Sequence, residues 1–336
     1  MRRRNQNRST FWVSMGALGL CLAFVLPAFS YLPMFTRTRA GTAQMDHWDL
    51  SAFPLTYSVN PSVGSNFSGG GDPVQIIEAS FNTWASAPNT ALLISRGSDT
   101  SIHQAAFDGT NLICFDCTDK SSFGGSTDTL AVTVSTTADA AGQTTKHGGV
   151  STGPGQILDA DIEFNPDVKW STGSTISGSQ QHLQTVATHE IGHFFGLDHS
   201  AVVRAVMFPF APDVSTTLSY DDVAGIAMLY PKSAPDVATG SISGTVKIEG
   251  GAAVFGAHVF ADSTSSQSAF GPTVRKSPIS TMSRPDGSYT IQGVPADSYT
   301  VTAEPLDDPV TDSDISGYAS AFSKASVQTN FGTHWH

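Results

Sequence analysis

Apolar residues alternate with polar ones in several short runs of the first two thirds of the chain. Such a period of two is typical of β-strands with one buried face. Loops rich in Gly, Ser and Thr separate the runs. The pattern predicts strands at Pro54–Asn60, Ala91–Ser95, Asn111–Phe115, Leu130–Ser135 and Ile157–Asn165.

Apolar residues at a helical spacing indicate three further segments. The first helix is expected to begin at Asp72-Pro73, because Asp is a good N-cap and Pro suits the first turn. The second covers Ser179–Phe195, and the third runs over Tyr220–Leu229 behind a capping Ser219. Together these elements predict an α+β domain over residues 48–231.

The pattern changes after a stretch rich in Pro, Ala and Asp, residues 232–239, which we interpret as a linker. Residues 240–305 contain short alternating runs and turn sequences such as Asp286-Gly287, and no helical pattern. Strands are expected at Ser243–Ile248, Ala257–Ala261, Ser288–Ile291 and Ser298–Ala303. The region is therefore expected to be an all-β sandwich, with residues 306–336 as a tail that could complete it.

The N-terminus has the pattern of an export signal. Arg2–Arg4 are basic, Phe11–Phe29 is almost entirely apolar, and Ala28-Phe29-Ser30 offers the small residues that a signal peptidase reads. We expect a cleaved signal peptide over residues 1–30. The alternative is an uncleaved membrane anchor formed by the same apolar run, residues 11–29. Both interpretations place the remainder outside the cytoplasm, secreted or in the cell envelope.

The composition is that of a globular protein without affinity for nucleic acid. Of the 336 residues, 40% are hydrophobic and 14% are charged, which favours folding over disorder. The formal net charge of -12 excludes general attraction to phosphate backbones. Residues 31–47, between the export signal and the first domain, are interpreted as a short polar N-terminal segment.

Two cysteines outside the export signal form a Cys-x-x-Cys sequence, Cys114 and Cys117. A zinc ribbon would need a second cysteine pair, which the sequence lacks. In an exported protein, a local disulfide between the two is therefore the expected state.

One segment, residues 189–199, carries the candidate chemistry. Residues four apart share a helix face, so His189 and His193 can direct two imidazole rings at one ion. His199 cannot join them from a continuous helix, because it would lie about 280° around the axis and about 15 Å along it. Gly196 permits the left-handed backbone that turns the chain back. The spacing therefore predicts a catalytic zinc bound by all three histidines, with one open position.

Glu190 adjoins the first predicted ligand and need not bind the metal. Zinc lowers the pKa of water and polarises a carbonyl group. A neighbouring carboxylate can take the proton from that water and deliver it to the leaving amine. We therefore predict that Glu190 is the general base of a zinc-dependent peptidase.

At these residues the sequence resembles the matrixin branch of the metzincin metallopeptidases. Ala205-Val206-Met207-Phe208-Pro209 is similar to the family's Met-turn, and Leu218–Tyr230 is similar to its final helix. The resemblance covers about residues 48–231. It implies a mixed, mostly parallel sheet with three helices, a catalytic zinc above Met207, and protein or peptide substrates bound as an extended strand.

Two metal sites of the family have weaker counterparts. Glu163 stands where a matrixin carries a histidine ligand of a structural zinc, so that second zinc is not expected. Asp159, Asp161 and Asp167 could bind calcium, which prefers oxygen ligands. The alternative, that these are ordinary loop carboxylates, stays open.

The substrate pocket and the means of latency also differ from the family pattern. The family's outer pocket wall is a Pro-x-Tyr sequence; Pro209 matches it, but Ala211 takes the Tyr position. In the family, a cysteine of the propeptide, the cysteine switch, keeps the enzyme latent. No cysteine lies between the export signal and the domain, so this switch has no counterpart here.

The C-terminal region resembles the carboxypeptidase regulatory-like domain, a transthyretin-like β-sandwich. The resemblance rests on segments such as Ser243–Val246, Gly256–Val259 and Asp286–Ile291. Such a module would act as a spacer or would bind a surface or carbohydrate ligand. The sequence thus predicts a secreted zinc metalloendopeptidase. The alternative is a non-catalytic surface or adhesion protein that acts through its C-terminal sandwich.

Overall fold

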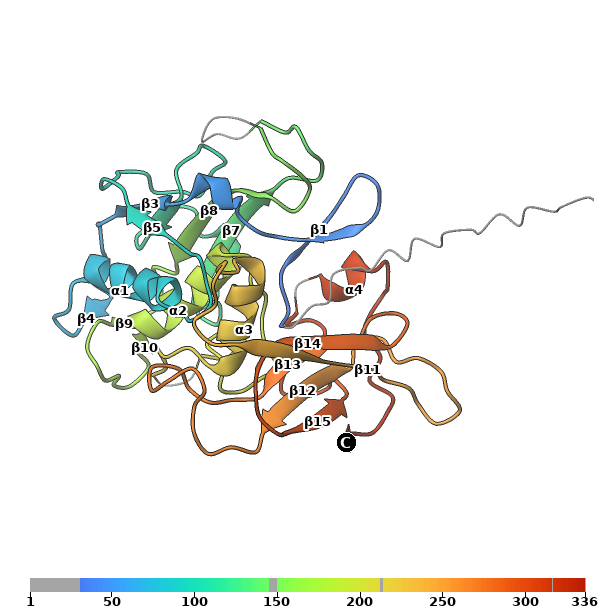
Figure 1. Ribbon diagram of the computed structural model, residues 1–336. Helices are drawn as coiled ribbons and strands as arrows, with labels where there is room; N and C mark the ends of the chain where they lie inside the picture. The colour runs from blue at the N-terminus through green and yellow to red at the C-terminus, as the bar shows by residue number, and fades with distance from the viewer. Residues whose placement is uncertain (1–30, 145–149, 212–213, 316, 336) are drawn as a thin grey trace, which may run out of the picture.

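The structure is a computed structural model that describes residues 31–144, 150–211, 214–315 and 317–335 (Figure 1). The predicted signal peptide or anchor, residues 1–30, lies outside the described residues. Within the described ranges, none of the helices has the length and apolar character needed to cross a membrane.

A five-stranded mixed sheet forms the centre of the N-terminal region, with the strand order β5-β3-β6-β8-β7. Its strands are β3 (Leu55–Asn60), β5 (Ile94–Arg96), β6 (Leu112–Cys114), β7 (Ala131–Thr137) and β8 (Ile157–Phe164). The first four in this order are parallel, and β7 pairs antiparallel with β8. The mixed, mostly parallel sheet expected from the sequence is confirmed. Strand β7 is therefore an edge strand, and only one of its two edges pairs with another strand of this sheet.

Three helices accompany this sheet, α1 (Pro73–Ala85), α2 (Leu183–Phe194) and α3 (Tyr220–Leu229). Helices α1 and α2 lie side by side (Figure 1), and the buried Trp84 indole on α1 donates to the Thr188 carbonyl on α2 at 2.7 Å. Aromatic side chains fill the space between helices and sheet, where Tyr57 of β3 stacks on Phe81.

Capping groups fix where the helices begin. The Asp72 carboxylate accepts from the Val74 amide, and Ser219 forms a reciprocal capping box with Asp222, so α1 and α3 begin where the sequence predicts. Helix α2 begins later than the expected Ser179. The reason is that Gln181–His182 forms the short strand β10 in a second sheet, beside β9 (Trp170–Ser171), which also pairs with β4 (Phe67–Ser68).

The segment 31–47 is packed into the structure, which its polar sequence does not indicate. Strands β1 (Phe35–Arg37) and β2 (Ala43–Met45) form an antiparallel hairpin. The Tyr31 side chain is 1% exposed and lies against Gly225 of α3. Short 3-10 helices at Leu50–Ala52 and Ser121–Phe123 complete the N-terminal region.

Two antiparallel sheets make up the C-terminal region, as its alternating pattern predicts (Figure 1). They consist of β11 (Thr239–Thr245) with β14 (Ser288–Pro295), and of β13 (Ile279–Met282), β12 (His258–Ser263), β15 (Tyr299–Glu304) and β16 (His334–Trp335). Strand β13 lies in a segment for which the sequence predicts no strand. Strand β16 comes from the tail and pairs with β15.

The tail also contributes a short helix, α4 (Tyr318–Ala321), which the sequence pattern does not predict. Around it lies a second hydrophobic cluster, which we call the tail core. Its buried members come from the N-terminal segment, the C-terminal sheets and the tail: Leu32, Phe255, Met282, Leu306, Val310, Ile315, Tyr318, Ala319 and Val327. The tail core therefore joins three parts of the chain that are far apart in sequence.

Helix α3 holds the two regions together through a buried carboxylate. Asp221 is 0% exposed and accepts from the Ser280 amide of β13 at 2.7 Å. It also accepts from the Ser200 hydroxyl, which lies in the loop after α2. Burial raises the pKa of Asp221 above its usual value, and these hydrogen bonds oppose the shift.

Replacing Asp221 with Ala should lower the free energy of unfolding by about 1–3 kcal/mol, because buried donors at Ser200 and Ser280 would lose their acceptor. Denaturant unfolding measures this loss. Asp99→Ala, which breaks an exposed ion pair with Arg96, is the control and should cost less than about 1 kcal/mol. Equal stabilities of the two variants would contradict a structural role for Asp221.

Candidate metal centre

A cavity of about 650 Å³ opens between β7, α2 and the segment 206–211. Its lining includes Leu130 to Thr133, residues of α2, Val206, and Phe208 to Ala211. His189, Glu190 and His193 of α2, and His199 beyond it, all line this cavity. The residues that the sequence assigns to catalysis are thus gathered at one place.

The chain turns back after α2, and this brings the third histidine to the other two. Gly196 has a φ of +90°, and a side chain there would meet the Asp46 carbonyl, so glycine is required. The last helical carbonyls are satisfied by distant side chains: the Trp48 indole donates to Phe194 at 2.8 Å, and the Tyr230 hydroxyl donates to Phe195 at 2.6 Å.

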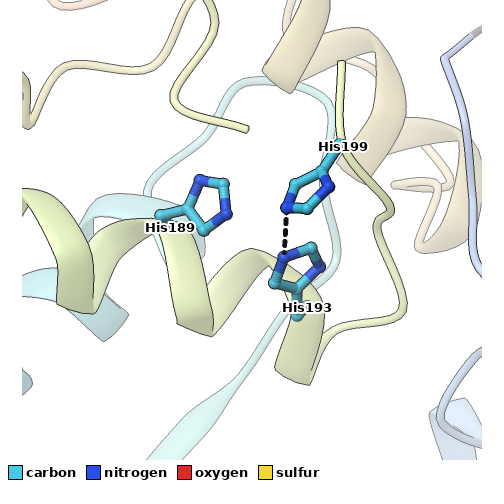
Figure 2. Close-up of side chains that lie close together, drawn as sticks. All are labelled: His189, His193 and His199. Carbon is cyan, nitrogen blue, oxygen red and sulfur yellow. Dashed lines mark hydrogen bonds between the residues drawn. The ribbon is translucent and has the colours of Figure 1, made fainter. Parts of the chain in front are cut away.

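Figure 2 shows the three imidazole rings facing one another. Their ligand atoms lie within 4.8 Å of one another, and no other group of three metal-ligating side chains occurs in the described part of the chain. The Nε2 atoms of His193 and His199 are 3.3 Å apart.

Backbone carbonyls fix the orientation of all three rings. The Nδ1 atoms of His189 and His193 lie 2.8 Å and 2.7 Å from the carbonyl oxygens of Val206 and Leu197. The Nδ1 of His199 contacts the carbonyl of Asp314. A carbonyl can only accept, so each Nδ1 carries the proton and each Nε2 of a neutral ring presents a lone pair. This is the tautomer that a metal-binding histidine needs.

The surroundings keep these rings neutral. Burial is the main cause that lowers the pKa of His189, to about 3, and it lowers the pKa of His193 well below the usual range. Burial also lowers the pKa of His199, against the opposing hydrogen bond and charge of Asp314. The three Nε2 lone pairs converge, and none of these nitrogens carries a proton to share with the others. A divalent cation satisfies such a donor set, whereas hydrogen bonds among the three rings cannot.

Glu190 lies beside the histidines and is 6% exposed. Burial raises the pKa of its carboxyl group to about 7, and a hydrogen bond from Thr133 partly opposes this shift. The Thr133 hydroxyl lies 2.8 Å from the carboxylate and 3.0 Å from the Glu190 carbonyl. The sequence does not indicate a role for Thr133, because its position in a predicted strand gives no sign of a contact with a residue 57 positions away.

Met207 is buried and packs against α2. Its sulfur would lie 2.2 Å from a Cβ atom placed on Gly192, so the glycine leaves room for it against α2. The Asp222 carboxylate accepts from the amides of Val206 and Met207 at 2.8 Å and 3.2 Å. The capping residue of α3 therefore also holds the turn that carries Met207.

Pro209 and Ala211, the two positions compared with the family's pocket wall, both line the cavity. The two cysteines lie away from it. Cys114 and Cys117 are joined by a disulfide whose Cα atoms are 5.7 Å apart, and they pack with Leu112 and Ile102.

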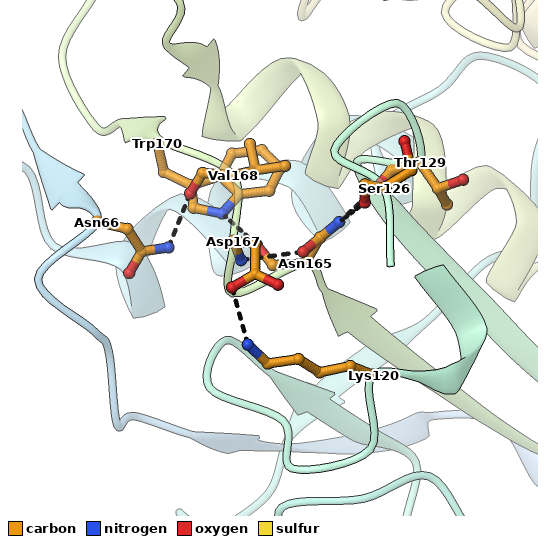
Figure 3. Close-up of polar contacts among 8 residues, drawn as sticks. All are labelled: Asn66, Lys120, Ser126, Thr129, Asn165, Asp167, Val168 and Trp170. Atoms are coloured by element: carbon orange, nitrogen blue, oxygen red, sulfur yellow. Dashed lines mark hydrogen bonds and ion pairs between the residues drawn. The ribbon is translucent and has the colours of Figure 1, made fainter. Parts of the chain in front are cut away.

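Asp159 and Asp161, two of the carboxylates considered for calcium, lie two residues apart on β8, and the described part of the chain holds no group of three metal-ligating side chains around them. Asp161 accepts from the amides of Leu112 and Ala106, at 2.8 Å and 2.9 Å. Asp167 forms an exposed ion pair with Lys120 (Figure 3).

Glu163, for which the sequence resemblance predicts no zinc-binding role, is buried and forms a hydrogen bond with the backbone. It accepts from the Ala105 amide at 2.9 Å. The neighbouring Asn165 donates to the carbonyls of Ser126 and Thr129 (Figure 3), which anchors the loop that borders the cavity.

Three neutral histidines beside a buried carboxylate form a site whose donor atoms could hold a divalent metal ion. Comparison with known proteins gives the family: residues 48–231 match the family described as Matrixin, and the chain belongs to this family. Matrixin homologues such as matrilysin and stromelysin are zinc metalloendopeptidases.

Several known proteins are similar to part of the chain. Matrilysin of Rattus norvegicus is 43% identical over 82 residues, which are 24% of this chain and 30% of the relative. Metalloendoproteinase 1 of Glycine max is 37% identical over 91 residues, 23% of this chain and 30% of the relative. Karilysin of Tannerella forsythia is 41% identical over 69 residues, 20% of this chain and 14% of the relative. The matches span no more than 30% of the length of these three relatives.

Gly192→Ala should destabilise the protein although alanine is the better helix former. The added methyl group would meet the Met207 sulfur at 2.2 Å and Trp84 at 2.9 Å, both buried. Overpacking outweighs the gain in helix propensity, for a net loss of roughly 1–2 kcal/mol. Thermal and denaturant unfolding measure it, with Gly153→Ala, which meets nothing within 4 Å, as the control. A Gly192→Ala protein as stable as wild type would refute this packing.

Proposed function

We propose that this protein is a zinc-dependent endopeptidase that uses His189, His193 and His199 as metal ligands and Glu190 as general base. One observation carries the proposal: three Nε2 lone pairs converge beside a buried carboxylate in an open cavity. Membership of the matrixin family supports the same activity.

The donor set is the one expected for a catalytic zinc: three imidazoles on the protein side and room in the cavity for water and substrate. Zinc held there would polarise a substrate carbonyl and lower the pKa of water. Glu190 would accept the proton of the attacking water on a carboxylate oxygen and pass it to the leaving amine nitrogen. Thr133 holds that carboxylate in place through its 2.8 Å hydrogen bond.

The substrate would bind as an extended chain along the free edge of β7. Residues Ala131 to Thr133 of this strand line the cavity, and their outer edge lacks a partner strand in the sheet order. An added strand forms main-chain hydrogen bonds that are independent of side-chain identity. No Lys or Arg occurs among the described residues that line the cavity, so nothing there would select a C-terminal carboxylate. This favours cleavage within a chain over removal of its last residue.

Glu190→Gln should retain zinc and lower hydrolysis by about 10²- to 10⁴-fold, because the proton acceptor is lost while the ligands remain. The assay uses a peptide blocked at both ends, with zinc content measured on the same sample. Glu78→Gln, a change on α1 at a half-buried residue that does not line the cavity, is the control. Hydrolysis by Glu190→Gln at the wild-type rate would exclude this mechanism, and an inactive wild type that binds no zinc would favour the adhesion alternative.

Export and the role of the C-terminal region belong to the same proposal. Basic residues before the apolar run of residues 11–29 support export, and cleavage would leave Tyr31 as the first residue. N-terminal sequencing of the exported protein should find Tyr31; an intact Met1 would instead indicate the anchor.

The two antiparallel C-terminal sheets support a transthyretin-like module, for which a surface or carbohydrate ligand is proposed.

A further inference from the structure

The third histidine obtains its carbonyl partner from a distant part of the chain. His189 and His193 donate to Val206 and Leu197, which lie within the matrixin region. His199 donates to Asp314, 115 residues further along and outside that region. The metal centre is therefore oriented in part by the tail that follows the C-terminal sheets.

We propose that Asp314 is a positioning residue for the metal: its backbone carbonyl fixes the tautomer and orientation of His199. The proposal rests on the proposed function in taking zinc as the ion. Residues 306–315 would then contribute to metal affinity although they lie outside the matrixin region.

A tight turn holds the Asp314 carbonyl in place. The Asp314 carboxylate accepts from the amide and the hydroxyl of Thr311, both at 2.8 Å. The Asp314 amide in turn donates to the Thr311 carbonyl at 3.0 Å. The side chain of Asp314 thus shapes the turn, while its carbonyl is left to face His199.

The tail core anchors this turn on both sides. Val310 and Ile315, which flank it, are 2% and 4% exposed and belong to that cluster. Ala201 and Phe208, which lie on the loop after His199, pack against the same cluster. The turn and the metal-binding loop consequently share one hydrophobic contact surface, so the carbonyl cannot shift without disturbing packing.

The chemical consequence concerns the proton of the imidazole. A neutral ring carries its proton on either nitrogen, and only the form protonated on Nδ1 offers Nε2 to a metal. A carbonyl acceptor at Nδ1 selects that form and fixes the ring plane. Loss of such a partner typically weakens metal binding by about 10- to 100-fold.

The test compares zinc affinity in three variants of the full chain, measured by competition with a chromophoric chelator. Asp314→Ala removes the side-chain bonds that shape the turn and should weaken zinc binding by about 10- to 100-fold. Asp314→Asn keeps an oxygen acceptor for Thr311 and should restore near wild-type affinity. Asp286→Ala is the matched control, because Asp286 caps Ser288 in an exposed turn in the same way, and it should leave affinity unchanged.

A spectroscopic measurement separates positioning from general instability. The visible absorption of Co²⁺ bound in place of zinc should change in Asp314→Ala and not in Asp286→Ala, because only the former alters a ligand's orientation. If Asp314→Ala does not fold, Thr311→Val, which removes one of the two bonds, should show a smaller loss of zinc affinity.

Wild-type affinity in both Asp314→Ala and Thr311→Val would overturn the proposal. So would an Asp314→Asn protein as weak as Asp314→Ala, because the effect would then come from the carboxylate charge and not from the carbonyl. Failure of the wild-type protein to bind zinc would instead refute the proposed function.

Discussion

The hydrogen bond from each histidine Nδ1 to a backbone carbonyl is the interaction on which the metal centre depends. Without it, a neutral imidazole would be free to place its proton on either nitrogen, and the three Nε2 lone pairs would not converge. The acceptors are Val206, Leu197 and Asp314. Each comes from a different segment, so the folding of the entire molecule determines the chemistry of one site.

Much of the remaining architecture can be understood as support for these acceptors. Asp222 holds the turn that presents Val206, and the bend at Gly196 presents Leu197. The tail core and the buried Asp221 hold the C-terminal region against α3 and the metal-binding loop. The matrixin region and the β-rich region, which look separable in the sequence, thus both contribute contacts to the histidine site.

The sequence predicts what depends on local spacing and misses what depends on contacts across long separations. The histidine spacing, the capping box at Ser219 and the alternation in β3 are local signals. Strand β3 and helix α3 form as expected, and α2 carries His189 and His193 although it begins later than the sequence predicts. Thr133 and Asp314 act across 57 and 115 residues, so no local pattern reveals them. Tyr31 looks like the start of a polar segment, yet tertiary packing against Gly225 buries it.

The central claim is that three histidines hold a zinc ion that is required to cleave peptide bonds. The most direct measurement follows zinc content and hydrolysis of a doubly blocked peptide on one sample of the full chain, before chelation, after chelation and after zinc is restored. The predicted result is one zinc per chain, loss of hydrolysis with the metal, and recovery when zinc returns. Hydrolysis at an unchanged rate by the metal-free protein would contradict the claim.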